Sequence, residues 1–131
     1  MIGYWGSHSD SYLIVISIGI LLLFGLPLLI APIAWARVFR WRLPEHEHLA
    51  IYFGRCLGGV ASVLAVLSYK VASTPALQPF YFQLMIGLFV VLTLVHVYGA
   101  LRKIQPLTET VEIVFWALLI VLTICFYPSG H

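Results

Sequence analysis

Three ionisable residues, Arg55, His96 and Glu112, stand inside long apolar stretches of this 131-residue chain. Apolar stretches of this length are typical of helices that cross a membrane. Charged side chains there are costly, so they face the interior of a helical bundle and find partners. Counted from the ends of their stretches at 1.5 Å per residue, the three residues reach similar depths. We therefore expect an ion pair between Arg55 and Glu112, with His96 close to it. A polar pocket open to the cytoplasm would be completed by Tyr52, Tyr98 and Thr93.

This polar group has two interpretations. As a structural feature, a buried ion pair would fix the register of the helices. As a ligand site, Arg55 and His96 would hydrogen-bond a carbonyl oxygen, such as that of a quinone headgroup, which makes quinone the candidate cofactor. Haem b is not favoured, because ligation by two histidines needs both at matching depth. Only His96 lies inside a segment, and His48 stands at the mouth of another.

The other candidates for chemistry are weaker. Glu45-His46-Glu47-His48 alternates in an extended stretch, so at most two of its side chains would face one ion, and we predict no metal site. Cys56 and Cys125 are expected near opposite membrane faces, too far apart for a disulfide. The sequence has no glycine-rich phosphate loop and no nucleophile beside a base. It therefore predicts no catalytic residues and favours a protein that is not an enzyme.

The amino-acid composition indicates the medium that surrounds the chain. Hydrophobic residues make up 62% of the chain and charged residues only 9%, with a mean hydropathy of +1.02. A soluble domain has about 25% charged residues, and so short a chain cannot bury this much apolar surface in an aqueous core. The solvent must be lipid. About 20 apolar residues cross a bilayer, and four segments approach or exceed this length: residues 12–36, 49–71, 80–101 and 109–127.

Short connections make neighbouring segments antiparallel. The sequence thus predicts an all-α fold, an integral membrane four-helix up-down bundle that forms a single transmembrane domain over residues 1–131. Pro27 and Pro32 lie in the second half of the first segment, where each removes a backbone donor. We expect a kink or an early end near Pro32.

Basic residues flank the segments unevenly. The middle loop is flanked only by Lys70, whereas the first and third loops carry Arg37, Arg40, Arg42, Arg102 and Lys103. The positive-inside rule places these two loops in the cytoplasm and both termini on the non-cytoplasmic side. No cleavable signal is recognisable. We expect a multi-pass protein of the bacterial plasma (inner) membrane. A net charge of only +2 argues against nucleic acid as a partner.

Small residues form a second pattern, on the 49–71 segment. Gly54, Gly58 and Ser62 recur at every fourth position, which lets the backbone of another helix approach closely. That helix can belong to the same bundle or to a partner, and the pattern leaves both open.

Three features of this layout resemble the DoxX-like group of small four-helix membrane proteins. They are the proline-bearing end of the first segment (Gly25-Leu26-Pro27 through Pro32), the aromatic and basic stretch Trp35 to Arg42, and Gly54-Arg55-Cys56-Leu57-Gly58-Gly59. The resemblance implies a four-helix membrane fold and, in some relatives, an association with sulfur- or quinone-linked redox and oxidative-stress complexes. Arg55 and Gly58 or Gly59 match the group's arginine–glycine element.

We therefore predict a non-catalytic accessory or structural membrane protein. It would dock to a larger membrane complex of redox, respiratory or photosynthetic type, or associate with copies of itself. The alternative is a quinone-linked membrane oxidoreductase component whose ligand-binding residues are Arg55, His96, Glu112, Tyr52 and Tyr98. A b-haem-binding membrane subunit that uses His96 is a third and less favoured alternative.

Overall fold

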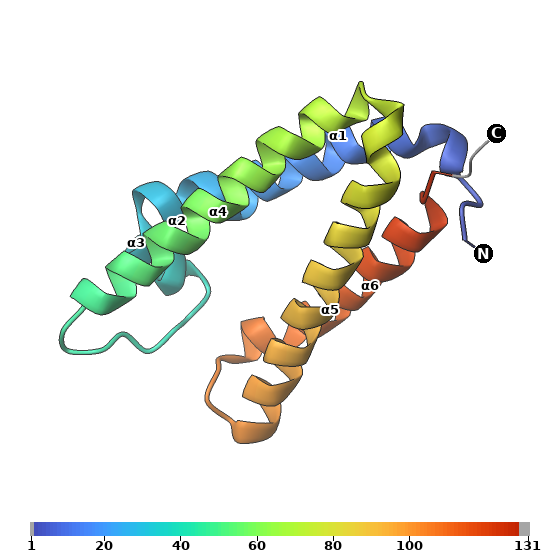
Figure 1. Cartoon of the computed structure of the whole chain (residues 1–131). Helices are drawn as coiled ribbons and strands as arrows, with labels where there is room; N and C mark the ends of the chain where they lie inside the picture. The colour runs from blue at the N-terminus through green and yellow to red at the C-terminus, as the bar shows by residue number, and fades with distance from the viewer. Residues whose placement is uncertain (1, 129–131) are drawn as a thin grey trace. The chain divides into compact units, whose positions relative to one another are not determined.

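All regular structure in the described part of the chain is helical, as the sequence predicts. The computed structural model describes residues 2–128 and shows no strand among them (Figure 1). These residues include four helices long and apolar enough to cross a membrane: Gly6–Ile30, His48–Ala72, Pro75–Arg102 and Leu107–Cys125. They fall into two compact units. We call Leu13–Lys70 the middle unit, and the described residues before and after it the terminal unit.

The first half of the middle unit is a helix interrupted by prolines. Pro27 lies in the first turn of the second α-helical piece, where its missing N–H is best tolerated. The chain then leaves helical geometry at Ala31, just before Pro32, which confirms the expected kink or early end. The successive pieces are α1 (Ser9–Ile20), the π-helix η2 (Leu21–Gly25), α2 (Leu26–Ile30) and α3 (Pro32–Val38).

A tryptophan compensates for one of these prolines. Pro27 cannot donate a helical hydrogen bond to the carbonyl of Leu23, four residues earlier. The indole Nε1–H of Trp35 donates to that oxygen at 2.8 Å. Trp35 also stacks on Phe39, with ring centroids 4.2 Å apart. The aromatic stretch after the break therefore completes the hydrogen bonding of the helix before it.

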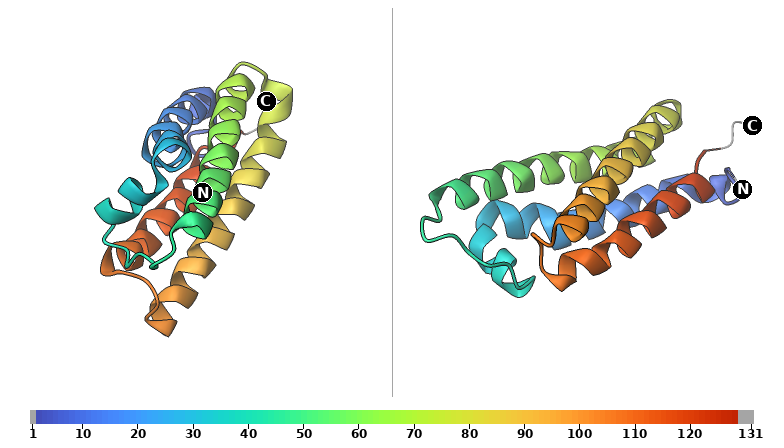
Figure 2. Two further views of the ribbon diagram at one scale, coloured as in Figure 1. Left: turned by 90° about the vertical axis from the view of Figure 1, so that its left-hand side faces the viewer. Right: turned by 90° about the horizontal axis from the view of Figure 1, so that it is seen from below.

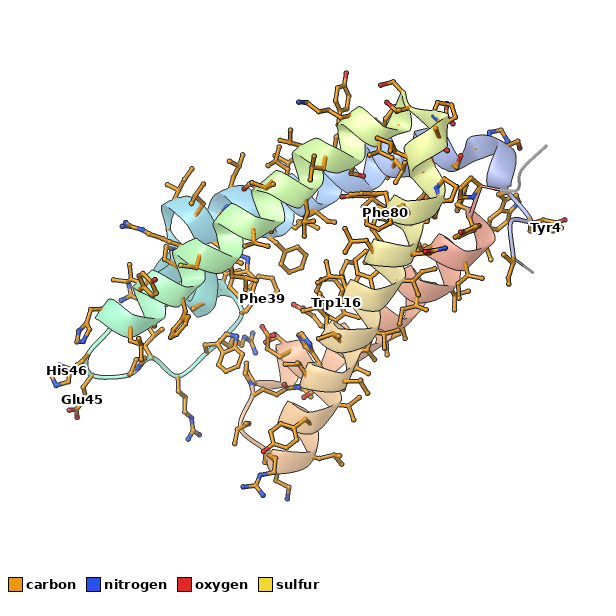
Figure 3. The ribbon with its side chains drawn as sticks, viewed as in Figure 1. Tyr4, Phe39, Glu45, His46, Phe80 and Trp116 are labelled. Atoms are coloured by element: carbon orange, nitrogen blue, oxygen red, sulfur yellow. The ribbon has the colours of Figure 1, made fainter. Side chains whose placement is uncertain are left out.

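The connection between α3 and α4 (His48–Ala72) is mostly exposed. Its residues Glu45 and His46 project away from the helices in Figure 3. Arg37 Nη2 lies 3.7 Å from Glu47 Oε1, an ion pair between side chains that remain largely accessible. Exposed pairs of this kind contribute little to stability.

Serine hydroxyls hold α4 to α1 within the middle unit, where the two helices run side by side (Figure 2). Ser17 Oγ donates to the carbonyl of Ala65 at 2.7 Å, and Ser68 Oγ donates to the carbonyl of Leu13 at 2.9 Å. Both serines are buried. Each hydroxyl bonds a backbone oxygen of the opposite helix, so these bonds fix the register of the pair.

The small residues of α4 pack inside the same unit. A Cβ added to Gly54 would lie 2.5 Å from the Cβ of Pro32, and one added to Gly58 would lie 2.7 Å from the carbonyl carbon of Leu28. Ser62, one turn further, donates to the carbonyl of Gly58 at 2.8 Å. The small-residue pattern of α4 therefore packs against the proline-interrupted helix of the same unit.

The terminal unit is built on an antiparallel pair, α5 (Gln78–Arg102) and α6 (Leu107–Cys125), joined by residues 103–106. The 3-10 turns η1 (Gly6–His8) and η3 (Pro75–Leu77) precede α1 and α5.

Aromatic residues form the core of the terminal unit. Phe82 and Phe89 of α5 are almost completely buried. Tyr12 stacks on Phe126 with ring centroids 4.9 Å apart, and its hydroxyl shares a 2.6 Å hydrogen bond with Thr123 Oγ1. The start of α1 is thereby tied to the end of α6.

The close contact at Gly58 is testable. A methyl group there would stand against the backbone of α2, so we expect Gly58→Ala to lower the free energy of unfolding by about 1–3 kcal/mol, the usual cost of overpacking. The matched control is Gly59→Ala, whose methyl would meet only Leu29 Cδ1 at 3.9 Å, and whose helix propensity favours folding by up to about 1 kcal/mol. Thermal unfolding in detergent, followed by circular dichroism, measures both. Equal stability of the two variants would contradict this packing.

Candidate functional site

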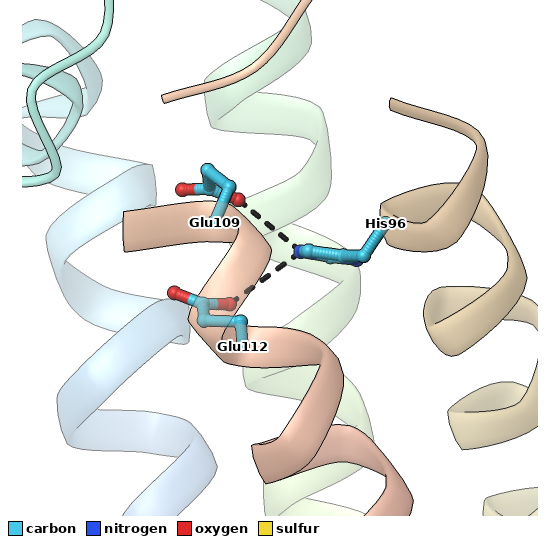
Figure 4. A group of neighbouring side chains, drawn as sticks. All are labelled: His96, Glu109 and Glu112. Atoms are coloured by element: carbon cyan, nitrogen blue, oxygen red, sulfur yellow. Dashed lines mark hydrogen bonds and ion pairs between the residues drawn. The ribbon is translucent and has the colours of Figure 1, made fainter. Parts of the chain in front are cut away.

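The α5–α6 pair brings one histidine and two glutamates together (Figure 4). His96 lies in the last turns of α5, whereas Glu109 and Glu112 lie in the first turns of α6. The two glutamates are three residues apart and therefore share one face of their helix. Because the connection between the helices is short, this face lies beside the end of α5.

The imidazole of His96 points between the two carboxylates. Its Nε2 lies 3.2 Å from Oε2 of Glu109 and 3.5 Å from Oε2 of Glu112. The side chains of the three residues are only 11%, 7% and 13% exposed, in the same order. One atom able to bind a metal from each residue lies within 4.8 Å of the other two, and among residues 2–128 no other such group of three is found.

The second ring nitrogen of His96 defines the tautomer. Nδ1 lies 2.7 Å from the carbonyl oxygen of Leu92, one turn earlier on α5. A carbonyl oxygen only accepts, so Nδ1 carries a proton and donates it. In the neutral ring, Nε2 then presents a lone pair to the two carboxylates. Three acceptors converge in that case, so a proton or a cation must lie among them.

The connection between the helices is bonded to the backbone of the site. Gln105 Nε2 donates to the backbone oxygen of His96 at 3.0 Å and to Thr110 Oγ1 at 3.2 Å. Gly99 leaves the space for this amide, since a Cβ there would lie 2.8 Å from Gln105 Cδ. One side chain thus links His96 to the helical turn that carries Glu109.

Aromatic rings cover the site along the helix axis. The ring of Trp116 lies 6.0 Å from that of His96 and 5.8 Å from that of Phe89, and both aromatic residues are buried. Rings in these positions exclude water, and electrostatic interactions become stronger in such a low-dielectric surrounding. The charge state of the three polar residues therefore affects stability strongly.

Two of the predicted site residues, His96 and Glu112, meet in the structure. Tyr98 lies on the same helix as His96 but is exposed. Thr93 Oγ1 donates to the carbonyl of Phe89 within its own helix, at 2.7 Å. Within the terminal unit, the part of the predicted pocket that the structure brings together is therefore His96 and Glu112, joined by a second acidic residue, Glu109.

The remaining predicted residues belong to α4. Arg55 and Tyr52 are exposed residues of the middle unit. The ion pair of Arg55 with Glu112 stays a prediction, and the partner that the structure gives Glu112 is His96. Cys56 and Cys125 are both free thiols.

Glu109 is the site residue that the sequence did not reveal. By position it is an acidic residue in the first turn of a helix, where the helix dipole favours it. The signal that would have identified it is its spacing of three residues from Glu112, which places both carboxylates on one face. The prediction of no metal site stays a prediction, and these three residues are a group whose ligand atoms are close enough to hold one ion.

Comparison of the chain with protein-family models, curated proteins and solved structures found no match. The likeness to the DoxX-like group is one of layout and stays a prediction.

The cluster predicts a characteristic pattern of stability changes. His96→Leu removes the partner of two buried carboxylates, so we expect a loss of about 3–5 kcal/mol, the usual cost of breaking a buried pair. The triple variant His96→Leu/Glu109→Met/Glu112→Met removes all the charges together and should recover most of that loss. Thermal unfolding in detergent gives both values, with His48→Leu, at an exposed position, as the control. A triple variant no more stable than His96→Leu would argue against a coupled charge cluster.

Proposed function

We propose that this chain is a non-catalytic multi-pass membrane protein that docks to a larger membrane assembly through α5. The four membrane-length helices support a location within the bilayer. The stretches between them, residues 31–47, 73–74 and 103–106, offer no room for a soluble domain. Most of what the described chain can offer a partner is therefore the lateral surface of its helices.

One face of α5 carries this proposal. Five residues at alternating spacings of three and four form an exposed seam, which we call the α5 seam: Leu84, Gly87, Val91, Leu94 and Tyr98. Such spacing keeps side chains on one side of a helix that packs along another helix. The α5 seam suits a transmembrane helix of a partner subunit.

Gly87, at the centre of the α5 seam, distinguishes it from a surface that merely contacts lipid. A Cβ at this position would have no described atom of the chain within 4 Å. A glycine inside a helix costs about 1 kcal/mol relative to alanine, and no contact within the described chain requires it. Close approach of a partner's backbone would supply the reason, as small residues do at interfaces between membrane helices.

The quinone-linked alternative has weaker support from the site. Both ring nitrogens of His96 have partners within the protein, Nδ1 at the Leu92 carbonyl and Nε2 at the two carboxylates. A quinone oxygen or a haem iron would have to displace the carboxylates from Nε2. The proposed function therefore needs neither cofactor.

We further propose that the first and third connections face the cytoplasm and that both termini lie outside. In a cysteine-free background (Cys56→Ala/Cys125→Ala), we expect Ala76→Cys to react with a membrane-impermeant maleimide in intact cells. Glu45→Cys and Ile104→Cys, at the basic loops, should react only after permeabilisation. All three positions are exposed. Labelling of Glu45→Cys in intact cells, with Ala76→Cys protected, would show the opposite orientation and contradict this proposal.

Replacing Gly87 by a residue with a large side chain tests the docking surface. We expect Gly87→Leu to weaken association with the partner at least about tenfold, or about 1.4 kcal/mol, because its side chain would block close approach of a helix. Co-purification from native membranes in nanodiscs, followed by native mass spectrometry, measures the loss. The matched control is Val114→Leu, an exposed position on α6.

Two results would contradict the proposal: wild-type protein that is always isolated as a lone 14.7 kDa chain, or unchanged partner stoichiometry in Gly87→Leu. A mass that is a multiple of 14.7 kDa would identify the partner helix as that of a second copy.

A further inference from the structure

The charge of the cluster formed by His96, Glu109 and Glu112 points to what completes it. Because Nδ1 of His96 already carries the proton that it donates to Leu92, a second proton on Nε2 makes the ring a cation. One imidazolium and two ionised carboxylates still sum to one negative charge, in a segment whose surroundings are apolar. A divalent cation bound by a neutral imidazole and two carboxylates brings the sum to zero, and so does one further proton on a carboxylate. Neutrality is strongly favoured where water is excluded.

We propose that His96 Nε2, Glu109 and Glu112 bind one divalent first-row transition-metal ion, with Zn²⁺ as the reference case. Imidazole nitrogen and carboxylate oxygen are the ligands that such ions share. The imidazole distinguishes this site from one for Mg²⁺ or Ca²⁺, which prefer ligands made of oxygen alone.

The spacing of the three ligand atoms fits a single ion. Ligands held about 2.1 Å from a tetrahedral Zn²⁺ lie about 3.4 Å from one another. The Nε2 of His96 lies 3.2 Å and 3.5 Å from the nearer oxygens of Glu109 and Glu112. All three ligand atoms lie within 4.8 Å of one another, so one ion placed between them would be near each of the three.

The hydrogen bonds around His96 are also those expected for a histidine that binds a metal. A histidine that binds a metal usually donates its other N–H to a carboxylate or a backbone carbonyl, which orients the ring. Nδ1 of His96 makes this bond to Leu92, on the helix that carries the ring itself. The two glutamates stand on one face of α6, and Gln105 bonds the connection to the backbone of His96. All three ligands are thus held by one helical pair of the terminal unit.

Three protein ligands leave a tetrahedral ion one further position, which water or a group of a partner can take. The metal site does not depend on docking through the α5 seam, because none of its three residues belongs to that seam. Either proposal can fail while the other stands.

The test is metal binding by the whole chain in nanodiscs, purified with a tag that contains no histidine. The protein is treated with a chelator, incubated with Zn²⁺, and desalted, after which metal per chain is measured by mass spectrometry of the elements. We expect about one Zn²⁺ per wild-type chain, not displaced by excess Mg²⁺. His96→Gln and Glu112→Gln should each lower the affinity at least about tenfold. Substitution with Co²⁺ adds an absorption spectrum that reports the coordination geometry of the wild-type protein.

The matched control is His46→Gln/His48→Gln, which removes two exposed histidines whose rings lie 6.2 Å apart. This variant should bind Zn²⁺ as the wild type does. Circular dichroism and gel filtration verify that each variant is folded. If a site variant does not fold, the wild-type stoichiometry and Co²⁺ spectrum decide the matter.

Two results would overturn the proposal. The first is wild-type protein that retains no Zn²⁺ and shows no Co²⁺ spectrum of a bound ion, which would leave protons as the positive charge of the cluster. The second is binding that survives in His96→Gln/Glu112→Gln but is lost in His46→Gln/His48→Gln.

Discussion

A polar group inside a membrane has no water to bind, so the protein itself must supply its partner. The membrane-length helices of this chain follow that constraint closely. Ser17 bonds the Ala65 carbonyl of the neighbouring helix, and the hydroxyl of Tyr12 bonds Thr123. The same constraint acts more strongly on charge, because an unpaired charge costs more than an unpaired hydroxyl. It explains why a histidine and two glutamates, on two different helices, share one place.

The helical fold was largely predictable because hydropathy is a local property. The hydropathy of each segment indicates by itself whether that segment lies in lipid. Four membrane-length helices could therefore be expected without knowing how any of them pack. The break near Pro32 was equally local, since a proline removes a donor wherever it stands. The division into two units was not predictable in this way. It depends on which side chains are in contact. The sequence does not indicate which residues the serines of α1 or the small residues of α4 contact.

The site was predictable only in part, for a related reason. His96 and Glu112 were recognisable because each is ionisable within an apolar stretch. Glu109 was not recognised, because an acidic residue at the start of a helix is common and is stabilised by the helix itself. Whether Glu109 joins the cluster depends on the rotation of α6 against α5, which the Gln105 side chain helps to fix. The pairing of Arg55 with Glu112 rests on depth alone and stays a prediction.

The bond between Trp35 and Leu23 bears on the order in which the chain is made. The two residues are only 12 positions apart, whereas the serine bonds between α1 and α4 join residues 48 and 55 positions apart. A chain is synthesised from its N-terminus and folds as it emerges. The carbonyl exposed by Pro27 can therefore be satisfied before any residue of α4 has been added. The first segment can therefore form with the Leu23 carbonyl already hydrogen-bonded. Helix α4 then packs against a helix that has already formed.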